Sequence, residues 1–166
     1  MGKNGSYSEK DLDQILDKGF INSSSFTEWF LSKTRFSKLN ATYKWSRSDH
    51  PWGRVPLEVK NPLTGEIEKV IRESETDILV VFENEDNRSI ALHIENKLAD
   101  GAYTQYQPEL YAERGKLWLN TEKYSNYSDF ETVLVAPIEF YANNFEASQC
   151  FDKFISYEEV AILLPE

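Results

Sequence analysis

The segment DILVVFENEDNRSIALHIENK, residues 77–97, holds two apolar runs rich in β-branched residues, 78–82 and 90–94. The polar residues 84–87 between the runs are typical of a turn, so the segment predicts a β-hairpin. If Glu83 pairs with Ser89, the same register sets Asp77 opposite Glu95.

Side chains alternate between the two faces of a strand, so Glu95 and Lys97 share a face, and in this register Asp77 lies on it too. Two neighbouring acids repel each other, and a divalent cation with oxygen ligands relieves that repulsion. Mg²⁺ suits such a pair because it needs few protein ligands and accepts phosphate oxygens. The alternative is a surface ion pair at a sheet edge, where such side chains commonly lie.

Further motifs follow in order along the chain: SETD at 74–77, IENK at 94–97, QPELYAERG at 107–115, VLVAP at 133–137 and ISYEE at 155–159. Together they resemble the PD-(D/E)XK nuclease superfamily. The resemblance implies a restriction-endonuclease-like α/β core, in which helices flank a central mixed β-sheet. It departs from the superfamily pattern in one place, since no proline precedes Asp77.

The resemblance also implies roles for individual residues. Asp77, Glu95 and the backbone carbonyl of Asn96 would hold Mg²⁺, for which Mn²⁺ could substitute, and Lys97 would be the catalytic lysine. Gln107 and Tyr111, which stack at i and i+4 on one helix face, would approach the nucleic acid. Ordinary packing of a helix with a half-buried tyrosine explains the same spacing.

Three more residues are candidates for the site. Glu28 could complete it from a helix, although its position in the sequence Ser25-Phe26-Thr27-Glu28 also fits a capping box. Glu75 shares the face of Asp77 and is a reserve ligand or a solvated acid. His93 shares the face of Glu95, where it borders the pocket or serves as a structural, hydrogen-bonded histidine.

The net charge of −10 argues against a generic nucleic-acid binder. The charge is segregated, however, because residues 33–60 carry seven cations and two acids. Aromatics lie among these cations, so Lys44, Arg47 and Arg54 are candidates for nucleic-acid binding. The alternative is a proline-rich loop whose aromatics cover the core. No His or Cys lies near His50 in the sequence, which argues against zinc.

The surrounding chain predicts helices from Ser8 to Gly19, from Ser24 or Ser25 onward, from Gln107 and from Tyr157 to Leu164. Residues 66–73 are expected to form an edge strand before Asp77, and 132–140 a buried strand parallel to the hairpin. We expect one domain over 1–166, with a helical part at 8–36, an irregular connection at 37–64 and a core at 65–166.

These features favour a Mg²⁺-dependent nuclease acting on nucleic acid, DNA more than RNA, in defence or repair, with a second copy or a recognition subunit as further partner. Two alternatives stay open: a catalytically silent binding module of the same fold, and an acidic decoy that mimics DNA. One cysteine, a polar start and no apolar run of about 18 residues favour the cytoplasm over a membrane.

Overall fold

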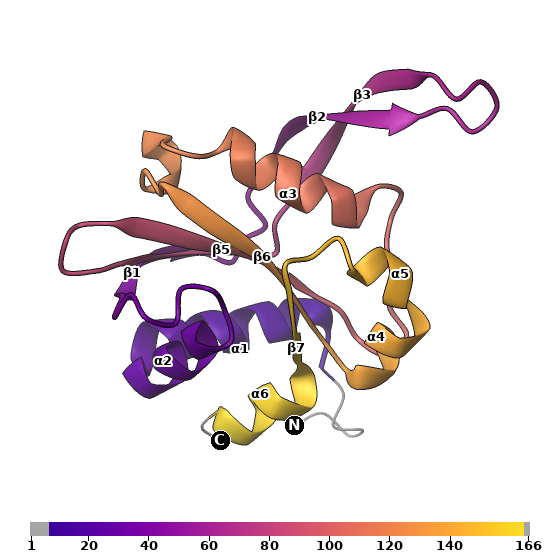
Figure 1. Ribbon diagram of the computed structural model, residues 1–166. Coiled ribbons are helices and arrows are strands. Elements are labelled where there is room, and N and C mark those ends of the chain that lie inside the picture. The colour runs from indigo at the N-terminus through magenta and orange to yellow at the C-terminus, as the bar shows by residue number, and fades with distance from the viewer. Residues whose placement is uncertain (1–6, 165–166) are drawn as a thin grey trace.

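The computed structural model describes residues 7–164 and contains a five-stranded mixed sheet in the order β1-β4-β5-β6-β7 (Figure 1). Its strands are β1 (Thr42–Arg47), β4 (Ile78–Glu83), β5 (Ser89–Asn96), β6 (Asp129–Ala136) and β7 (Lys153–Ser156). β4 pairs antiparallel with β1 and β5, whereas β5, β6 and β7 run parallel to one another. The expected mixed sheet flanked by helices is confirmed.

The β4–β5 hairpin has the predicted register, with Glu83 opposite Ser89 and Ile78 opposite Ile94. Apart from Glu83 at the turn, every residue of both strands is buried, so a slip by one residue would exchange the faces of two packed strands. Asn84 stabilises the turn because its Oδ1 accepts hydrogen bonds from the amides of Asp86 and Arg88.

Helices cover both faces of the sheet (Figure 1). α1 (Glu9–Asn22) and α2 (Ser24–Ser32) pack on the face formed by Ile78, Val80 and Leu92. α3 (Gln107–Leu117) lies on the opposite face and connects, with the short η1 (Glu122–Tyr124), from β5 to the parallel β6. This is the crossover that a parallel pair requires.

The C-terminal helices are short: α4 (Ile138–Asn143), α5 (Phe145–Ser148) and α6 (Tyr157–Leu163). α6 begins at Tyr157 as predicted, and its N-cap residue Ser156 forms a capping box with Glu159. The strand predicted over 132–140 instead ends at Ala136, because Pro137 caps α4.

The prediction of irregular structure over 37–64 was wrong. β1 lies there, and β2 (Trp52–Lys60) pairs with β3 (Ile67–Glu75) in a separate two-stranded sheet that projects from the body in Figure 1. β3 is therefore not the edge strand of the central sheet. Pro56 is accommodated because both strands of a two-stranded sheet have a free edge. Val55 and Leu57 lie on one face of this arm and pack against Leu110 of α3.

The N-terminal helices also differ from the prediction. α1 continues through Gly19 to Asn22, and Gly19 serves packing, since a Cβ there would lie 2.8 Å from the ring of Phe26. α2 is capped by Ser23, whose side chain accepts from the Phe26 amide. Glu28 is therefore not part of a capping box.

Candidate metal centre and active site

Asp77 and Glu95 lie at the end of the β4–β5 hairpin away from its turn. Asp77 directly precedes β4, and Glu95 is the penultimate residue of β5. The Asp77 side chain accepts a hydrogen bond from the Asn96 amide at 2.9 Å. Asp77 and Glu95 are only 6% and 1% exposed, so the alternative of a solvated surface ion pair was wrong.

Burial next to other acids makes the charged carboxylates unfavourable. The pKa of Asp77 lies well above its ordinary value because the carboxyl is buried and because Glu95 and Asp13 repel its negative charge. Burial also raises the pKa of Glu95, an effect that Lys97 and Tyr111 partly offset. A bound cation would stabilise both carboxylates in their charged form.

Lys97 is buried beside Glu95, 5% exposed. Its ammonium group donates hydrogen bonds to the Ala102 carbonyl at 2.8 Å and to Gln107 Oε1 at 3.2 Å, and lies 3.2 Å from Glu95 Oε1. The trio that the sequence predicted thus converges, with the lysine held in a fixed position.

Gln107 and Tyr111 reach the same carboxylate from α3. Gln107 Nε2 donates to Glu95 Oε1 at 2.9 Å, and the Tyr111 hydroxyl donates to the other Glu95 oxygen while accepting from the Asp77 amide at 3.1 Å. Tyr111 is fully buried, so the expectation that it approaches nucleic acid was wrong, as was the half-buried alternative. Its hydroxyl orients the two acids.

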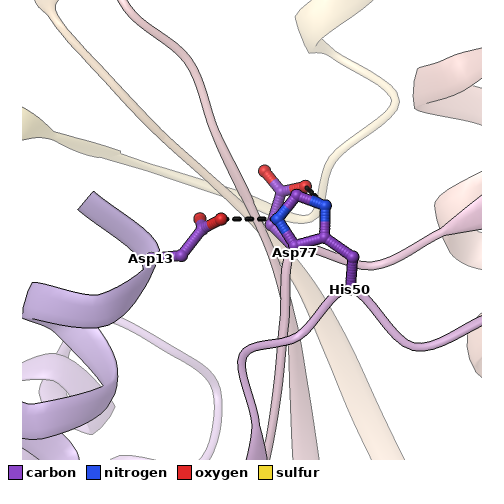
Figure 2. Close-up of side chains that lie close together, drawn as sticks. All are labelled: Asp13, His50 and Asp77. Carbon is purple, nitrogen blue, oxygen red and sulfur yellow. Dashed lines mark hydrogen bonds and ion pairs between the residues drawn. The ribbon is translucent and has the colours of Figure 1, made fainter. Parts of the chain in front are cut away.

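The helical acid of the site is Asp13 on α1, which the sequence analysis missed. Asp13 is fully buried, and its carboxylate accepts from Asn96 Nδ2 and lies 2.6 Å from His50 Nε2 (Figure 2). Asp13 shares the buried face of α1 with Leu16 and Phe20, and an acid on an apolar helix face was the signal available in the sequence.

Glu28 does not belong to this cluster. It is exposed on α2 and lines a separate cavity of about 640 Å³ with Phe20, Leu31 and Tyr43. The prediction that Glu28 could complete the site was therefore wrong, because α1 rather than α2 supplies the acid.

His50 joins Asp13 to Asp77 (Figure 2). It also contacts Glu75. It lies in the β1–β2 connection with a φ of 55°, and its Nδ1 is 2.9 Å from Glu75 Oε1 and 3.7 Å from Asp77 Oδ1. Hydrogen bonding to Asp13, stronger than the opposing effect of burial, raises the His50 pKa to about 10. The partners of His50 are thus carboxylates that lie far from it in sequence, whereas the sequence analysis considered only nearby His and Cys residues.

Asp13, His50 and Asp77 each offer one donor atom, and these atoms lie within 4.8 Å of one another. Asn96 Oδ1, on the amide that contacts Asp13, is buried without a hydrogen-bond partner among the described residues. Carboxylate oxygens suit Mg²⁺ and Mn²⁺, whereas imidazole suits later transition metals such as Zn²⁺. The side chains present fit a divalent cation.

His93 has a structural role and does not border the site. It is fully buried, with Nδ1 2.8 Å from Thr76 Oγ1 and Nε2 3.0 Å from the Tyr127 hydroxyl. Arg114 Nε donates to the Thr76 hydroxyl, which leaves that hydroxyl to donate to His93 Nδ1. Tyr127 donates to the Gly115 carbonyl, so its hydroxyl oxygen accepts from His93 Nε2. One ring nitrogen accepts and the other donates, as in a neutral imidazole. Burial, with repulsion from Arg114, lowers the His93 pKa well below its ordinary value.

The three cations predicted to bind nucleic acid are dispersed. Lys44 lies near the turn end of the hairpin and pairs with Glu83 at 2.8 Å. Arg47 pairs with Asp49 at 2.9 Å, and Arg54 is exposed on the projecting arm. The structure does not bring them together into one patch.

Comparison of the chain with protein-family models, curated proteins and solved structures gave no match. Within residues 7–164, no helix combines the length and apolar character needed to cross a membrane.

Proposed function

We propose that this chain is a metal-dependent nuclease of the PD-(D/E)XK superfamily that hydrolyses phosphodiester bonds, in DNA more than in RNA. The observation that carries the proposal is the buried convergence of Asp77, Glu95 and Lys97 at the open end of one hairpin. Two carboxylates and an ammonium group cost free energy when buried, and chains retain such groups mainly where they serve chemistry.

The cation would be held by Asp77, Glu95 and the Asn96 carbonyl. Asp13 of α1 and His50 of the β1–β2 connection, which cluster with Asp77, would add further donor atoms. When bound, Mg²⁺ or Mn²⁺ polarises a phosphate oxygen and makes an attacking water more acidic. The raised pKa of Asp77 supports this assignment, because a nearby dication stabilises the carboxylate that burial and its acidic neighbours destabilise.

Lys97 contributes a fixed positive charge. Its contacts with the Ala102 carbonyl and Gln107 hold the ammonium group beside Glu95, where it can donate a hydrogen bond to an anionic phosphate oxygen. Gln107 and Tyr111 keep the Glu95 carboxylate oriented from α3. Such preorganisation is what electrostatic catalysis requires.

The topology is consistent with the proposed family, since an antiparallel hairpin carries the acids and a helix crosses over to a parallel strand. The acidic-decoy alternative needs acids spread over an exposed face, whereas the acids at this site are buried.

The test is cleavage of labelled single-stranded DNA, double-stranded DNA and RNA with Mg²⁺, Mn²⁺ or EDTA. We expect cleavage that needs metal and is lost in Lys97→Ala but kept in Lys116→Ala, which removes an exposed lysine of α3. Absence of metal-dependent cleavage of every polymer would contradict the proposal.

A further inference from the structure

A cavity of about 570 Å³ lies between the β2–β3 arm and the start of α3. Its lining includes Trp52, Arg72, Ser74, Glu75, Gln107 and Leu110. The volume is within the range of sites for small organic ligands.

Two lining residues connect this cavity directly to the proposed metal centre. Glu75 contacts His50, which in turn contacts Asp13. Gln107 contacts both Glu95 and Lys97. A group bound in the cavity would therefore lie next to the carboxylates.

Trp52 gives the cavity an aromatic wall. Its side chain is 60% exposed. Trp52 lies two residues after His50 and pairs with Glu75 at the base of the arm, so the indole is close to the proposed metal centre. The Pro51 carbonyl accepts from the Thr76 amide at 3.0 Å, which fixes the backbone before Trp52 to the residue before Asp77. An exposed indole on a fixed backbone can stack on a planar ring.

The remaining lining favours a neutral, hydrogen-bonding ligand over a bare phosphate. Glu73 and Glu75 would repel an anion, yet both can accept hydrogen bonds from exocyclic amines, as can the Gln105 amide. Arg72 is the one cation in the lining and lies over the Tyr106 ring at 5.7 Å. This combination suits a nucleobase.

We propose that this cavity binds one unpaired nucleotide of the substrate, with its base stacked on Trp52 and its backbone leading to the proposed metal centre. A paired base cannot enter, since both its face and its hydrogen-bonding edge are occupied within the duplex. The inference rests on the proposed nuclease function and narrows its substrates to single strands or unpaired ends.

The experiment measures binding of 12-nucleotide probes, each with one 2-aminopurine, as single-stranded DNA, single-stranded RNA and blunt duplex DNA. Ca²⁺ replaces Mg²⁺, and a gel checks that each probe stays intact. We expect Trp52→Ala to weaken binding of a single strand about tenfold, or about 1.4 kcal/mol, and to abolish the quenching of 2-aminopurine. Trp52→Phe should keep most of both signals, and Phe145→Ala, which removes an exposed aromatic on α5, should match the wild type.

Weaker binding of Trp52→Ala than of wild type to single-stranded DNA or to single-stranded RNA supports the proposal. The polymer affected shows whether the bound nucleotide carries deoxyribose or ribose. Equal binding of wild type and Trp52→Ala to both single strands, or binding of the duplex alone, overturns it. If the duplex is nevertheless cleaved with Mg²⁺, the nuclease function stands and only this inference fails. If no probe is bound or cleaved, both fail.

Discussion

Replacing Asp77 with asparagine should stabilise the metal-free protein while abolishing its metal binding. The raised pKa of Asp77 means that folding penalises the charged carboxylate, through burial and through repulsion by Glu95 and Asp13. Asparagine removes the charge and keeps an oxygen for the Asn96 amide, which Asp77 contacts at 2.9 Å.

The magnitude follows from the cost of that charge. Single stabilising substitutions commonly gain about 0.5–2 kcal/mol. For a chain of this length, about 1 kcal/mol shifts the unfolding temperature by about 2–4 °C, so a rise of about 1–8 °C is expected in EDTA. The penalty is absent below the ordinary pKa of 3.8 and grows as pH rises above it, so the gain should be present at pH 8 and smaller at pH 4.

Thermal unfolding followed by circular dichroism provides the assay, in EDTA and with Mg²⁺ or Mn²⁺. Wild type should be stabilised by metal and Asp77→Asn should not, whereas Asp86→Asn, at an exposed turn, should behave as wild type. An Asp77→Asn protein that is less stable than wild type in EDTA, or that is stabilised equally by metal, would refute this electrostatic reasoning.

Three further predictions concern the surrounding residues. Tyr111→Phe should lower the free energy of unfolding by about 1–3 kcal/mol in urea titrations, because the buried Asp77 amide loses its hydroxyl partner; an unchanged value would contradict the contact. Asp13→Asn should reduce Mn²⁺ affinity in calorimetry while Glu28→Gln does not, and the reverse order would restore Glu28 as the helical acid. Metal-free wild type should lose stability as pH rises from about 6.5 towards about 10, because charged His50 stabilises the fold fully below pH 6.5 and loses its proton near pH 10. His50→Gln should make stability less dependent on pH over this range. Equal pH dependence in the two proteins would show that His50 is not charged.

The hairpin and its acids could be predicted because their signals are local. Apolar runs on both sides of a polar turn define the register, and the register alone sets Asp77 opposite Glu95. The contacts of Gln107 with Glu95 and Lys97 were not predicted, although at most 12 residues separate these motifs.

Asp13 and His50 could not be paired from the sequence because 37 residues separate them and no shared motif contains them. Their meeting depends on how α1 packs against the end of the sheet. The buried position of Asp13 on an apolar helix face was visible in principle, whereas the positive φ that directs His50 into the cluster was not.

The strands within 37–64 were missed because proline and glycine were taken as signs of irregular structure. A proline excludes a residue from the interior of a broad sheet but not from a two-stranded arm with two free edges. The alternation of Val55 and Leu57, which α3 covers through Leu110, was the competing signal.

The most direct test of the central claim compares cleavage rate with metal affinity in wild type, Lys97→Ala and Lys97→Met. Both variants should bind Mn²⁺ with affinity close to wild type, and circular dichroism should show that they remain folded. We predict that each variant cleaves nucleic acid at least about 100-fold more slowly, because the positive charge of Lys97 no longer stabilises the phosphate. Cleavage by folded, metal-bound variants at the wild-type rate would contradict the assignment of Asp77, Glu95 and Lys97 as a nuclease site.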